Sequence, residues 1–335
     1  MPRPRSPENR NLPPGVYREK GRFVFRSWDG ARLKSGVVLC RDTAPLSQVW
    51  SAYEALQPKK EQLLRDLVRD YMVSEKFGSL AYKTRRSAES AFHNLLDRPM
   101  ASGATFGDTP VAVITPGVIR KYLDHRKESP VAANREVAYL SAAFSWAYER
   151  DLVTSNPCKG VRRNTEKART RYVSDEEYAA VYALATSSPP YIQPAMELAY
   201  LCRMRINEVL AARWSDVGEE GLLVRRSKGS RDGVTLWSDR LRAVIAACRA
   251  DGKVLGMTLI HDRKGAAITY EGFSTAWQRL MSRAKEHGIE TFTFHDLKAK
   301  GVSDFEGDKQ KASGHKTAAM VAVYDRKVPT VGSTR

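Results

Sequence analysis

Three short motifs in the C-terminal part of the chain combine cations, imidazoles and a phenol. In chain order they are Arg205 with Glu208, His295 with Lys298, and His315 with Tyr324. Side chains so far apart along a chain can act together only if one domain folds them onto one site. The sequence therefore predicts a C-terminal domain whose elements converge on these motifs.

Length and charge bound the kind of protein that this chain can be. Its 335 residues are enough for two or three domains, and 42% hydrophobic residues allow buried cores. The formal net charge is +17. Because lysines and arginines that neutralise phosphates give affinity without sequence preference, this charge favours a nucleic-acid partner over a charge that serves solubility alone.

The cysteines and the apolar runs argue against several other classes of protein. Cys40, Cys158, Cys202 and Cys248 form no CxxC pair and have no histidine cluster beside them, so we expect no zinc site, no disulfide framework and a reducing cytosol. The N-terminus lacks an apolar signal core, and no stretch approaches about 18 apolar residues. We therefore expect neither export nor a membrane span.

Residues 1–58 are predicted to form a small basic β unit and a connector. Residues 1–45 contain ten basic and four acidic residues, and apolar and polar residues alternate over 16–18, 22–25 and 31–34. This pattern predicts a three-stranded meander, with a helical connector over 46–58. Its aromatic residues can form a small core, lie against DNA beside the basic residues, or do both. The candidate DNA contacts are Arg3, Arg5, Arg10, Arg18, Arg22 and Arg26.

Residues 59–155 have the apolar spacing of a helical unit. Helices are predicted over 61–75, 82–96, 115–128 and 132–152. Thr115 and Pro116 are a favourable N-cap and first helical residue. A unit of four basic helices can clamp a duplex, although its composition alone fits any small bundle.

Residues 156–171 are predicted to be a cationic linker. They include Pro157, Gly160 and six basic residues against one glutamate. Such a tether suits a protein that wraps a duplex, and a plain solvated linker is the alternative. The candidate DNA contacts are Arg162, Arg163, Arg169 and Arg171.

Residues 172–335 are predicted to form a mixed α/β domain. A helix begins at 174–177, where acidic residues suit the first turn. Further helices are predicted over 196–213, 240–250, 270–287, 296–305 and 317–326, with a hairpin formed by 221–226 and 233–237.

A tyrosine can cut DNA reversibly without a cofactor. Its hydroxyl attacks the phosphodiester, expels a 5′-hydroxyl and forms a 3′-phosphotyrosine, and the reverse attack reseals the strand. The transition state needs fixed donors around the phosphate oxygens, and the leaving oxygen needs a proton. A lone tyrosine is usually structural, so Tyr324 is a candidate because of the cations and imidazoles near it in the sequence.

These motifs resemble the catalytic motifs of the tyrosine recombinases, the phage integrase family. The matching segments are Arg205-Ile-Asn-Glu208 with Trp214-Ser-Asp216 after it, His295-Asp-Leu-Lys298, and Gly314-His315 followed by Tyr324. Residues 3–17 are similar to the start of the arm-binding domain of lambda-type integrases. The sequence departs from the family pattern at Cys202-Arg203, where Thr-Gly is usual, at Ser313, where Leu is usual, and at Lys298, where Arg is usual.

The resemblance implies a role for each motif residue. Arg205 would grip the phosphate with its planar fork, and Glu208 would orient it, with Arg203 as a weaker rival for the same role. His295 would bind phosphate or move the tyrosine proton, with a buried structural histidine as the alternative. Lys298 would make a point-like phosphate contact, and His315 would act beside it. Nine residues of helix would separate His315 from Tyr324, so we expect a bend near Gly314.

The general acid implied by the resemblance is Lys228, in the turn of the predicted hairpin. A flexible ammonium whose pKa falls near other cations suits the protonation of a leaving 5′-hydroxyl. The neighbouring Arg225, Arg226 and Arg231 leave this assignment open.

The whole pattern implies a lambda-type phage or prophage integrase that needs no cofactor or metal. The expected fold is multidomain and mostly α, with an arm-binding β domain, a helical core-binding domain over 59–155 and a mixed α/β catalytic domain over 172–335. The expected partners are core-type and arm-type DNA sites, a tetramer with a Holliday junction, a host DNA-bending protein and an excisionase-like directionality factor, in the bacterial cytoplasm. The alternatives are a transposon recombinase, a type IB topoisomerase, and a DNA-binding relative weakened by Lys298.

Overall fold

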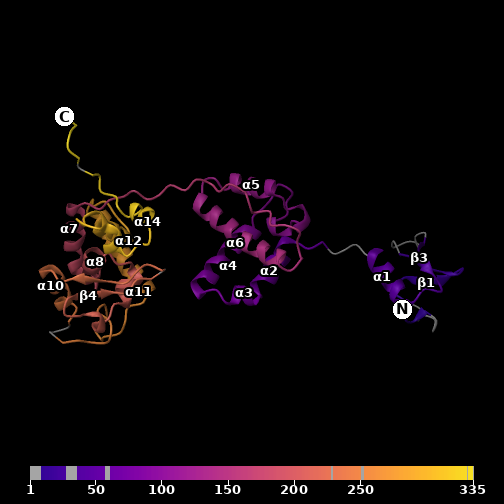
Figure 1. Cartoon of the computed structure of the whole chain (residues 1–335), viewed down its shortest axis with the longest axis horizontal. Coiled ribbons are helices and arrows are strands. Elements are labelled where there is room, and N and C mark those ends of the chain that lie inside the picture. The colour runs from indigo at the N-terminus through magenta and orange to yellow at the C-terminus, as the bar shows by residue number, and fades with distance from the viewer. Residues whose placement is uncertain are drawn as a thin grey trace. The chain divides into compact units, whose positions relative to one another are not determined.

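The computed structural model describes residues 9–27, 36–56, 61–227, 229–249, 253–329 and 331–334. The chain divides into two compact units, Met1–Glu166 and Lys167–Arg335 (Figure 1). Among the helices of the described ranges, none is both long and apolar enough to cross a membrane.

The N-terminal part of the first unit is a small antiparallel sheet. Its strands are β1 (Val16–Glu19), β2 (Arg22–Phe25) and β3 (Val37–Arg41), in the order β1-β2-β3. Lys20 and Gly21 both have positive φ, as the tight turn between β1 and β2 requires. The helix α1 (Leu46–Leu56) packs on the sheet through Val49. The predicted third strand, 31–34, lies outside the described residues, and β3 was not predicted.

The rest of the first unit is a helical bundle. Its helices are α2 (Leu64–Met72), α3 (Glu75–Gly78), α4 (Tyr82–Leu96), α5 (Pro116–His125) and α6 (Pro130–Tyr148). The single helix predicted over 61–75 is wrong, because the chain leaves the helix at Val73. Ser74 is extended, and its hydroxyl caps α3 by accepting from the Phe77 amide. Thr115 caps α5 as predicted, by accepting from the Val118 amide.

The first part of the predicted linker packs on this bundle. Cys158 is 3% exposed and belongs to the bundle's core. Asn164 is bound to two helices of the bundle: its backbone amide donates to Asn134 Oδ1, and its side chain donates to the Leu123 carbonyl. The boundary between the two units falls between Glu166 and Lys167, so residues 156–166 are bound to the helices and are not a free tether.

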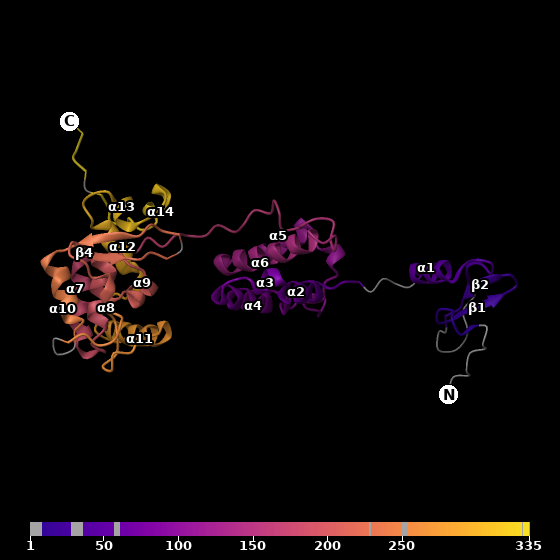
Figure 2. The same ribbon diagram turned by 60° about the horizontal axis from the view of Figure 1, so that its bottom comes forward.

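The second unit is mixed α/β (Figure 2). Its helices are α7 (Asp175–Leu184), α8 (Ile192–Leu201), α9 (Ile206–Ala211), α10 (Asp239–Ala247), α11 (Tyr270–Glu286), α12 (Phe294–Ser303), α13 (Lys309–Ser313) and α14 (Ala318–Ala322). The strands β4 (Gly221–Val224) and β5 (Gly233–Leu236) form the predicted antiparallel hairpin.

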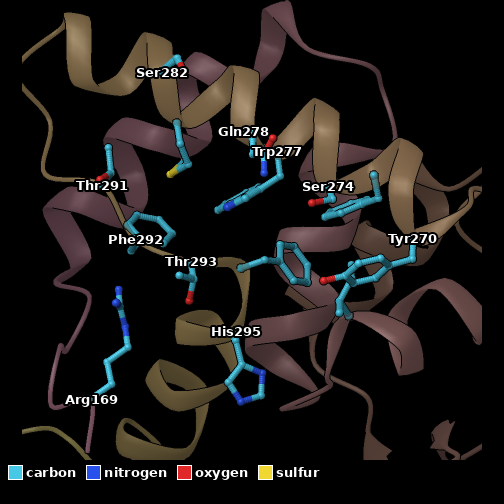
Figure 3. A pocket seen from close by; sticks show the side chains of 14 residues that line it. Arg169, Tyr270, Ser274, Trp277, Gln278, Ser282, Thr291, Phe292, Thr293 and His295 are labelled. Atoms are coloured by element: carbon cyan, nitrogen blue, oxygen red, sulfur yellow. The ribbon is translucent and has the colours of Figure 1, made fainter. Parts of the chain in front are cut away.

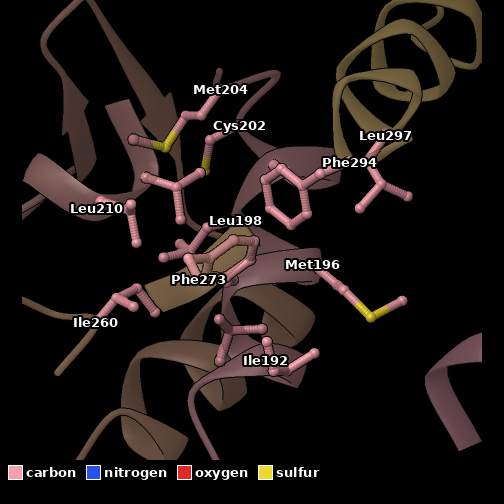
Figure 4. Close-up of a cluster of buried hydrophobic side chains, with 14 of the residues drawn as sticks. Ile192, Met196, Leu198, Cys202, Met204, Leu210, Ile260, Phe273, Phe294 and Leu297 are labelled. Atoms are coloured by element: carbon pink, nitrogen blue, oxygen red, sulfur yellow. The ribbon is translucent and has the colours of Figure 1, made fainter. Parts of the chain in front are cut away.

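The core of the second unit surrounds α8 (Figure 4). Met196 and Leu198 of α8 are fully buried, with Phe273 from α11 and Phe294 and Leu297 from α12 in the same cluster. The helices α8 and α12 approach closely at Gly301, because a Cβ there would lie 2.1 Å from the Tyr200 carbonyl oxygen. This contact fixes α12, the helix that carries two of the motif residues.

Two predicted helices of the second unit are wrong in extent. The segment 196–213 is two helices, because α8 ends at Leu201 and Arg203 has a φ of 52°. Arg205 is extended, with φ −79° and ψ 158°, and caps α9 with Glu208. The segment 317–326 contains only the short α14, which Thr317 caps, so Tyr324 follows the helix instead of ending it.

Candidate active site

Three of the predicted site residues meet around the ring of Tyr324, a residue that is 8% exposed. The hydroxyl oxygen of Tyr324 lies 3.0 Å from Nε2 of His295. The His315 ring stacks on the phenol, with centroids 4.7 Å apart. The Lys298 ammonium lies 5.3 Å from the phenol centroid. The fold thus brings two imidazoles and a cation to the one tyrosine that the spacing singled out.

The segment that carries Tyr324 is bound to α12 by hydrogen bonds. The Ser303 hydroxyl donates to the Tyr324 carbonyl and accepts from the Arg326 amide, at 3.0 and 2.7 Å. The Arg326 guanidinium pairs with the buried Asp296, at 2.6 Å. Sequence reasoning missed these anchors, because nothing in the spacing of Ser303 or Arg326 points to them.

His315 lies in the loop between α13 and α14. Gly314 ends α13 with a φ of 70°, which is the bend expected there. The Ser313 hydroxyl donates to the Lys309 carbonyl, so it accepts from Nδ1 of His315 at 2.9 Å. The neutral ring then carries its lone pair on Nε2, which is buried and has no partner among the described residues. Burial, helped by the Lys298 charge, lowers the pKa of His315 to about 4.

His295 also favours the neutral form. Burial, followed by the charges of Lys298 and Arg205, lowers its pKa below the ordinary value. A neutral imidazole 3.0 Å from the Tyr324 hydroxyl has the geometry of a proton acceptor.

Glu208 holds Arg205 in place. One carboxylate oxygen accepts from the Arg205 amide and the other from its Nη1, both at 2.8 Å. The Ser227 amide and hydroxyl donate to the same carboxylate. Burial alone would raise the pKa of Glu208, but the bonds from the Arg205 and Ser227 amides lower it to about 2. Lys228 itself lies outside the described residues, and the residue before it is tied to Glu208.

Lys298 and Lys300 have opposite surroundings, although both are buried. Nζ of Lys298 has no hydrogen-bond partner in the described part of the chain. Burial, then the charges of Arg226 and Arg205, lower the pKa of Lys298 to about 7. Lys300 pairs instead with Asp175 and Asp304, and its ammonium donates to Tyr172. Of the two lysines, Lys298 is the one with donors free to bind an anion.

Arg203 and Arg226 are both buried beside these residues. The Arg203 guanidinium lies 4.8 Å from the Phe305 ring centroid, and its Nε donates to the Ala312 carbonyl. Arg226 pairs with Glu208 at 3.5 Å. Arg203 is therefore bound to the end of α13, whereas Arg205 contacts Glu208 directly.

The arginines predicted to contact DNA differ in what they already bind. Arg169 pairs with Asp296, Arg171 with Glu177 and Glu290, and Arg26 with Glu19. The Arg18 guanidinium donates to the Asp42 carbonyl and covers the Phe23 ring. Arg10, Arg22 and Arg162 are exposed and Arg163 is half-buried, while Arg3 and Arg5 lie outside the described residues.

A cavity of about 820 Å³ opens beside the site (Figure 3). Its apolar wall includes Trp277 and Met281 of α11, and residues 291–295 form the facing wall. His295 and Arg169 line it near Thr293. His295 thus borders both this cavity and the tyrosine.

The chemistry available at Tyr324 is that of an anion site with a nucleophile. Lys298 Nζ and His315 Nε2 are buried polar atoms that lack partners among the described residues; a phosphate can accept from the ammonium directly, and from the imidazole once its Nε2 is protonated. In the same ranges, no group of His, Cys, Asp or Glu side chains is arranged to hold a metal ion.

Residues 171–329 match the phage integrase family. The integrase of Enterobacteria phage 434 is 26% identical over 97% of this chain and 96% of its own length, and that of Escherichia phage lambda is 25% identical over the same shares. The tyrosine recombinase XerC of Xanthomonas campestris is 24% identical over 65% of this chain and 71% of its own.

Solved structures share the fold. A lambda integrase dimer bound to a core site is similar with a TM-score of 0.67 and 22% identity, covering 97% of this chain and 99% of that one. The Tn1549 transposon integrase is similar with a TM-score of 0.61 and 15% identity, covering 80% of this chain and 96% of that one. The predicted fold class, mostly helical with small β elements, is confirmed. The chain therefore belongs to the phage integrase family of tyrosine recombinases, as a lambda-type site-specific DNA recombinase.

Proposed function

We propose that Tyr324 is the nucleophile of this recombinase and forms the 3′-phosphotyrosine intermediate. The observation that carries the proposal is the 3.0 Å contact between the Tyr324 hydroxyl and a neutral His295. The phenolic oxygen attacks phosphorus while its proton passes to Nε2 of His295. The bond from phosphorus to the 5′-oxygen breaks, and Lys228 protonates that oxygen. Attack by a 5′-hydroxyl reverses each step and rejoins the strands.

The negative charge that develops on the phosphate is met by fixed donors. Arg205, oriented by Glu208, offers its planar fork. The Lys298 ammonium, which has no hydrogen-bond partner in the described ranges, and His315 bind other oxygens; His315 donates once its Nε2 takes a proton. Such preorganised donors are usually the largest contribution to catalysis. Arg205, which Glu208 orients, would supply a fixed geometry, and Lys298, without a carboxylate partner in the described part of the chain, would supply positive charge.

The remaining parts of the chain bind and arrange DNA. In this proposal residues 1–58 bind arm-type sites, 59–155 bind core-type sites, 156–171 carry basic residues between them, and 172–335 catalyse. The exposed Arg10, Arg22 and Arg162 support these assignments. Arg3 and Arg5 belong to the same arm-type surface, and so do Arg18, whose bond to the Asp42 carbonyl is exposed, and Arg26, which would exchange its part-buried pair with Glu19 for phosphate. Arg163, Arg169 and Arg171 would contact DNA from the linker.

The wider assembly follows from the relatives. Lambda integrase has been solved as a dimer bound to a core site and as a tetramer bound to a Holliday junction. We extend both states to this chain, with a host DNA-bending protein and an excisionase-like directionality factor that select integration or excision. The reaction then takes place on DNA in the bacterial cytoplasm.

Covalent trapping tests the assignment of Tyr324. The substrate is a duplex with the chain's own core site, nicked close to the cleavage position. After cleavage the short fragment that carries the released 5′-hydroxyl diffuses away, so the strand cannot be rejoined and the adduct accumulates. Wild-type protein and Tyr148→Phe, at an exposed tyrosine of α6, are expected to form the adduct. Tyr324→Phe is expected to bind the duplex with unchanged affinity and to form none. An adduct with Tyr324→Phe would show that another residue attacks, and none with wild type would favour a DNA-binding relative without activity.

A further inference from the structure

Arg226 follows β4 and is buried, unlike its neighbour. The Arg226 side chain is 3% exposed, whereas that of Arg225 is 65% exposed and pairs with Asp216. Adjacent residues of an extended chain point to opposite faces, so Arg226 faces the interior. A buried guanidinium is costly unless its donors are satisfied; both Nη atoms of Arg226 have partners, whereas its Nε has none among the described residues, so the Nη contacts show what it does.

The partners of Arg226 are backbone carbonyls from two other segments. Nη1 donates to the Arg203 carbonyl, and Nη2 donates to those of Cys202 and Ala312, at 3.0 and 3.1 Å. Cys202 and Arg203 form the turn that leads into Arg205. Ala312 lies near the end of α13, three residues before His315. One side chain therefore joins the two segments that carry these site residues.

The backbone of the hairpin meets the same place. The Arg231 amide donates to the Gly314 carbonyl at 2.9 Å, and a Cβ on Gly314 would lie 2.4 Å from the Arg231 carbonyl oxygen. The hairpin, the turn at 202–204 and the end of α13 thus converge around Arg226.

Arg226 also contributes charge to the pocket of Lys298. After burial, the Arg226 charge is the largest cause that lowers the pKa of Lys298. Within the described ranges, the charged or titratable groups that influence or contact Lys298 include Arg203, Arg205, Glu208, Arg226, His295, His315 and Tyr324. Among these cations, Arg226 is bound to carbonyls and Glu208 instead of facing the tyrosine ring.

We propose that Arg226 is a positioning residue of the strand-transfer reaction, which holds the Arg205 and His315 segments against the hairpin and keeps a fixed positive charge beside Lys298. The inference rests on the proposed role of Tyr324. It also removes Arg226 from the candidates for general acid, because its guanidinium is bound to three carbonyls and does not deprotonate near neutral pH.

The test compares Arg226→Met, which removes both the planar guanidinium and its charge, with Arg226→Lys, which keeps the charge but not the planar guanidinium. Single-turnover cleavage of a core-site suicide duplex is measured over a pH series, with DNA affinity measured in parallel. Misplacement of a catalytic group by about 1 Å can lower a rate about a hundredfold, so both variants should cleave about 10- to 100-fold more slowly. DNA affinity should change less than about twofold, because one contact among many contributes little.

The pH profile separates positioning from general damage to the fold. Loss of a neighbouring positive charge raises the pKa of Lys298, so Arg226→Met should retain cleavage to higher pH than wild type. Arg226→Lys should restore the wild-type profile while remaining slow. Arg240→Met is the structural control, because Arg240 of α10 pairs with a buried carboxylate, that of Glu197 in α8. That variant should lower thermal stability and leave the pH profile unchanged.

Each outcome decides the proposal. Wild-type rates in both Arg226 variants, or a pH profile that does not move in Arg226→Met, would overturn it. If Arg226→Met does not fold, Arg226→Lys decides alone, because a wild-type rate there refutes the need for the fork. If wild-type protein forms no adduct at Tyr324, the proposed function fails instead. An adduct in wild type with no difference in the variants refutes only the role of Arg226.

Discussion

Nε2 of His295 and the hydroxyl oxygen of Tyr324 lie 3.0 Å apart, although the two residues belong to different elements. His295 is near the start of α12, and Tyr324 follows α14. The short distance depends on the anchoring of the Tyr324 carbonyl by Ser303, one α12 residue that the motif does not contain. The proposed nucleophile is therefore already paired with its proposed base in the DNA-free chain.

Replacing the proposed base should separate proton transfer from hydrogen bonding. His295→Gln can still bond to the Tyr324 hydroxyl but cannot accept its proton. General-base catalysis typically contributes about 10²–10⁴-fold, so cleavage should slow by about that factor with DNA affinity unchanged. The measurement is single-turnover cleavage with protein in excess over DNA. A rate within about threefold of wild type would assign the proton to another acceptor, since typical base effects are far larger.

The two buried lysines should respond in opposite ways. Lys298→Ala removes a cation that has no hydrogen-bond partner among the described residues, and a charge-assisted hydrogen bond is worth about 1.5–3 kcal/mol. Cleavage should therefore fall about ten- to a hundredfold, with the salt slope of DNA binding nearly unchanged. Lys298→Arg should retain activity if the pocket accepts the fork.

Lys300→Ala is the matched variant. It breaks the contacts with Asp175 and Asp304, so it should lower the free energy of unfolding while the folded protein cleaves at the wild-type rate. Thermal unfolding and single-turnover cleavage check both statements. A large loss of cleavage in Lys300→Ala with none in Lys298→Ala would exchange the roles of the two lysines.

The buried Lys298 should make stability depend on pH. Its folded-state pKa of about 7 lies below the unfolded value of 10.5, so the unfolded chain binds more protons between these values. The free energy of unfolding therefore rises with pH in this window, by at most about 1.4 kcal/mol per pH unit from this group. Below about pH 7 both states are protonated, and the destabilisation is largest.

Hydrogen exchange of the α12 amides at several pH values measures this dependence once corrected for the intrinsic exchange rate. Lys298→Met should flatten the slope between about pH 7 and 10 and raise protection near neutral pH. An unchanged slope would mean that the ammonium finds a partner or water in solution.

The sequence predicted the arrangement of motif residues where that arrangement depends on neighbouring residues in the chain. The Arg205 and Glu208 spacing, the turn before His315 and the hairpin all have local causes, and so the structure contains them. Arg226 was visible only as one of several basic residues near a turn, since its burial depends on carbonyls at Arg203 and Ala312. The break at Arg203 was missed for a similar reason: a positive φ at a non-glycine residue is set by tertiary contacts. The different roles of Lys298 and Lys300 likewise depend on which carboxylates the fold brings near.

Asp296 offers a test of how the nucleophile segment is held. Its buried carboxylate binds Arg326 after the tyrosine, Arg169 from the linker and the Thr293 cap. The Arg326 side chain is 7% exposed and that of Arg169 is 49% exposed, so the two pairs should differ in strength. Loss of one partner of a buried pair costs about 3–5 kcal/mol, whereas exposed pairs contribute about 0–1 kcal/mol.

Arg326→Ala should therefore lower the free energy of unfolding several times more than Arg169→Ala, as measured by denaturant unfolding. It should also slow adduct formation, because the Tyr324 segment loses its anchor to α12, while the nicked duplex still binds. Arg169→Ala should leave single-turnover cleavage at saturating protein near the wild-type rate and weaken DNA binding slightly, in keeping with its place in the linker. Equal losses of stability in the two variants would show that Asp296 is not held mainly by Arg326, and wild-type adduct formation in Arg326→Ala would mean that Ser303 alone suffices to hold the tyrosine.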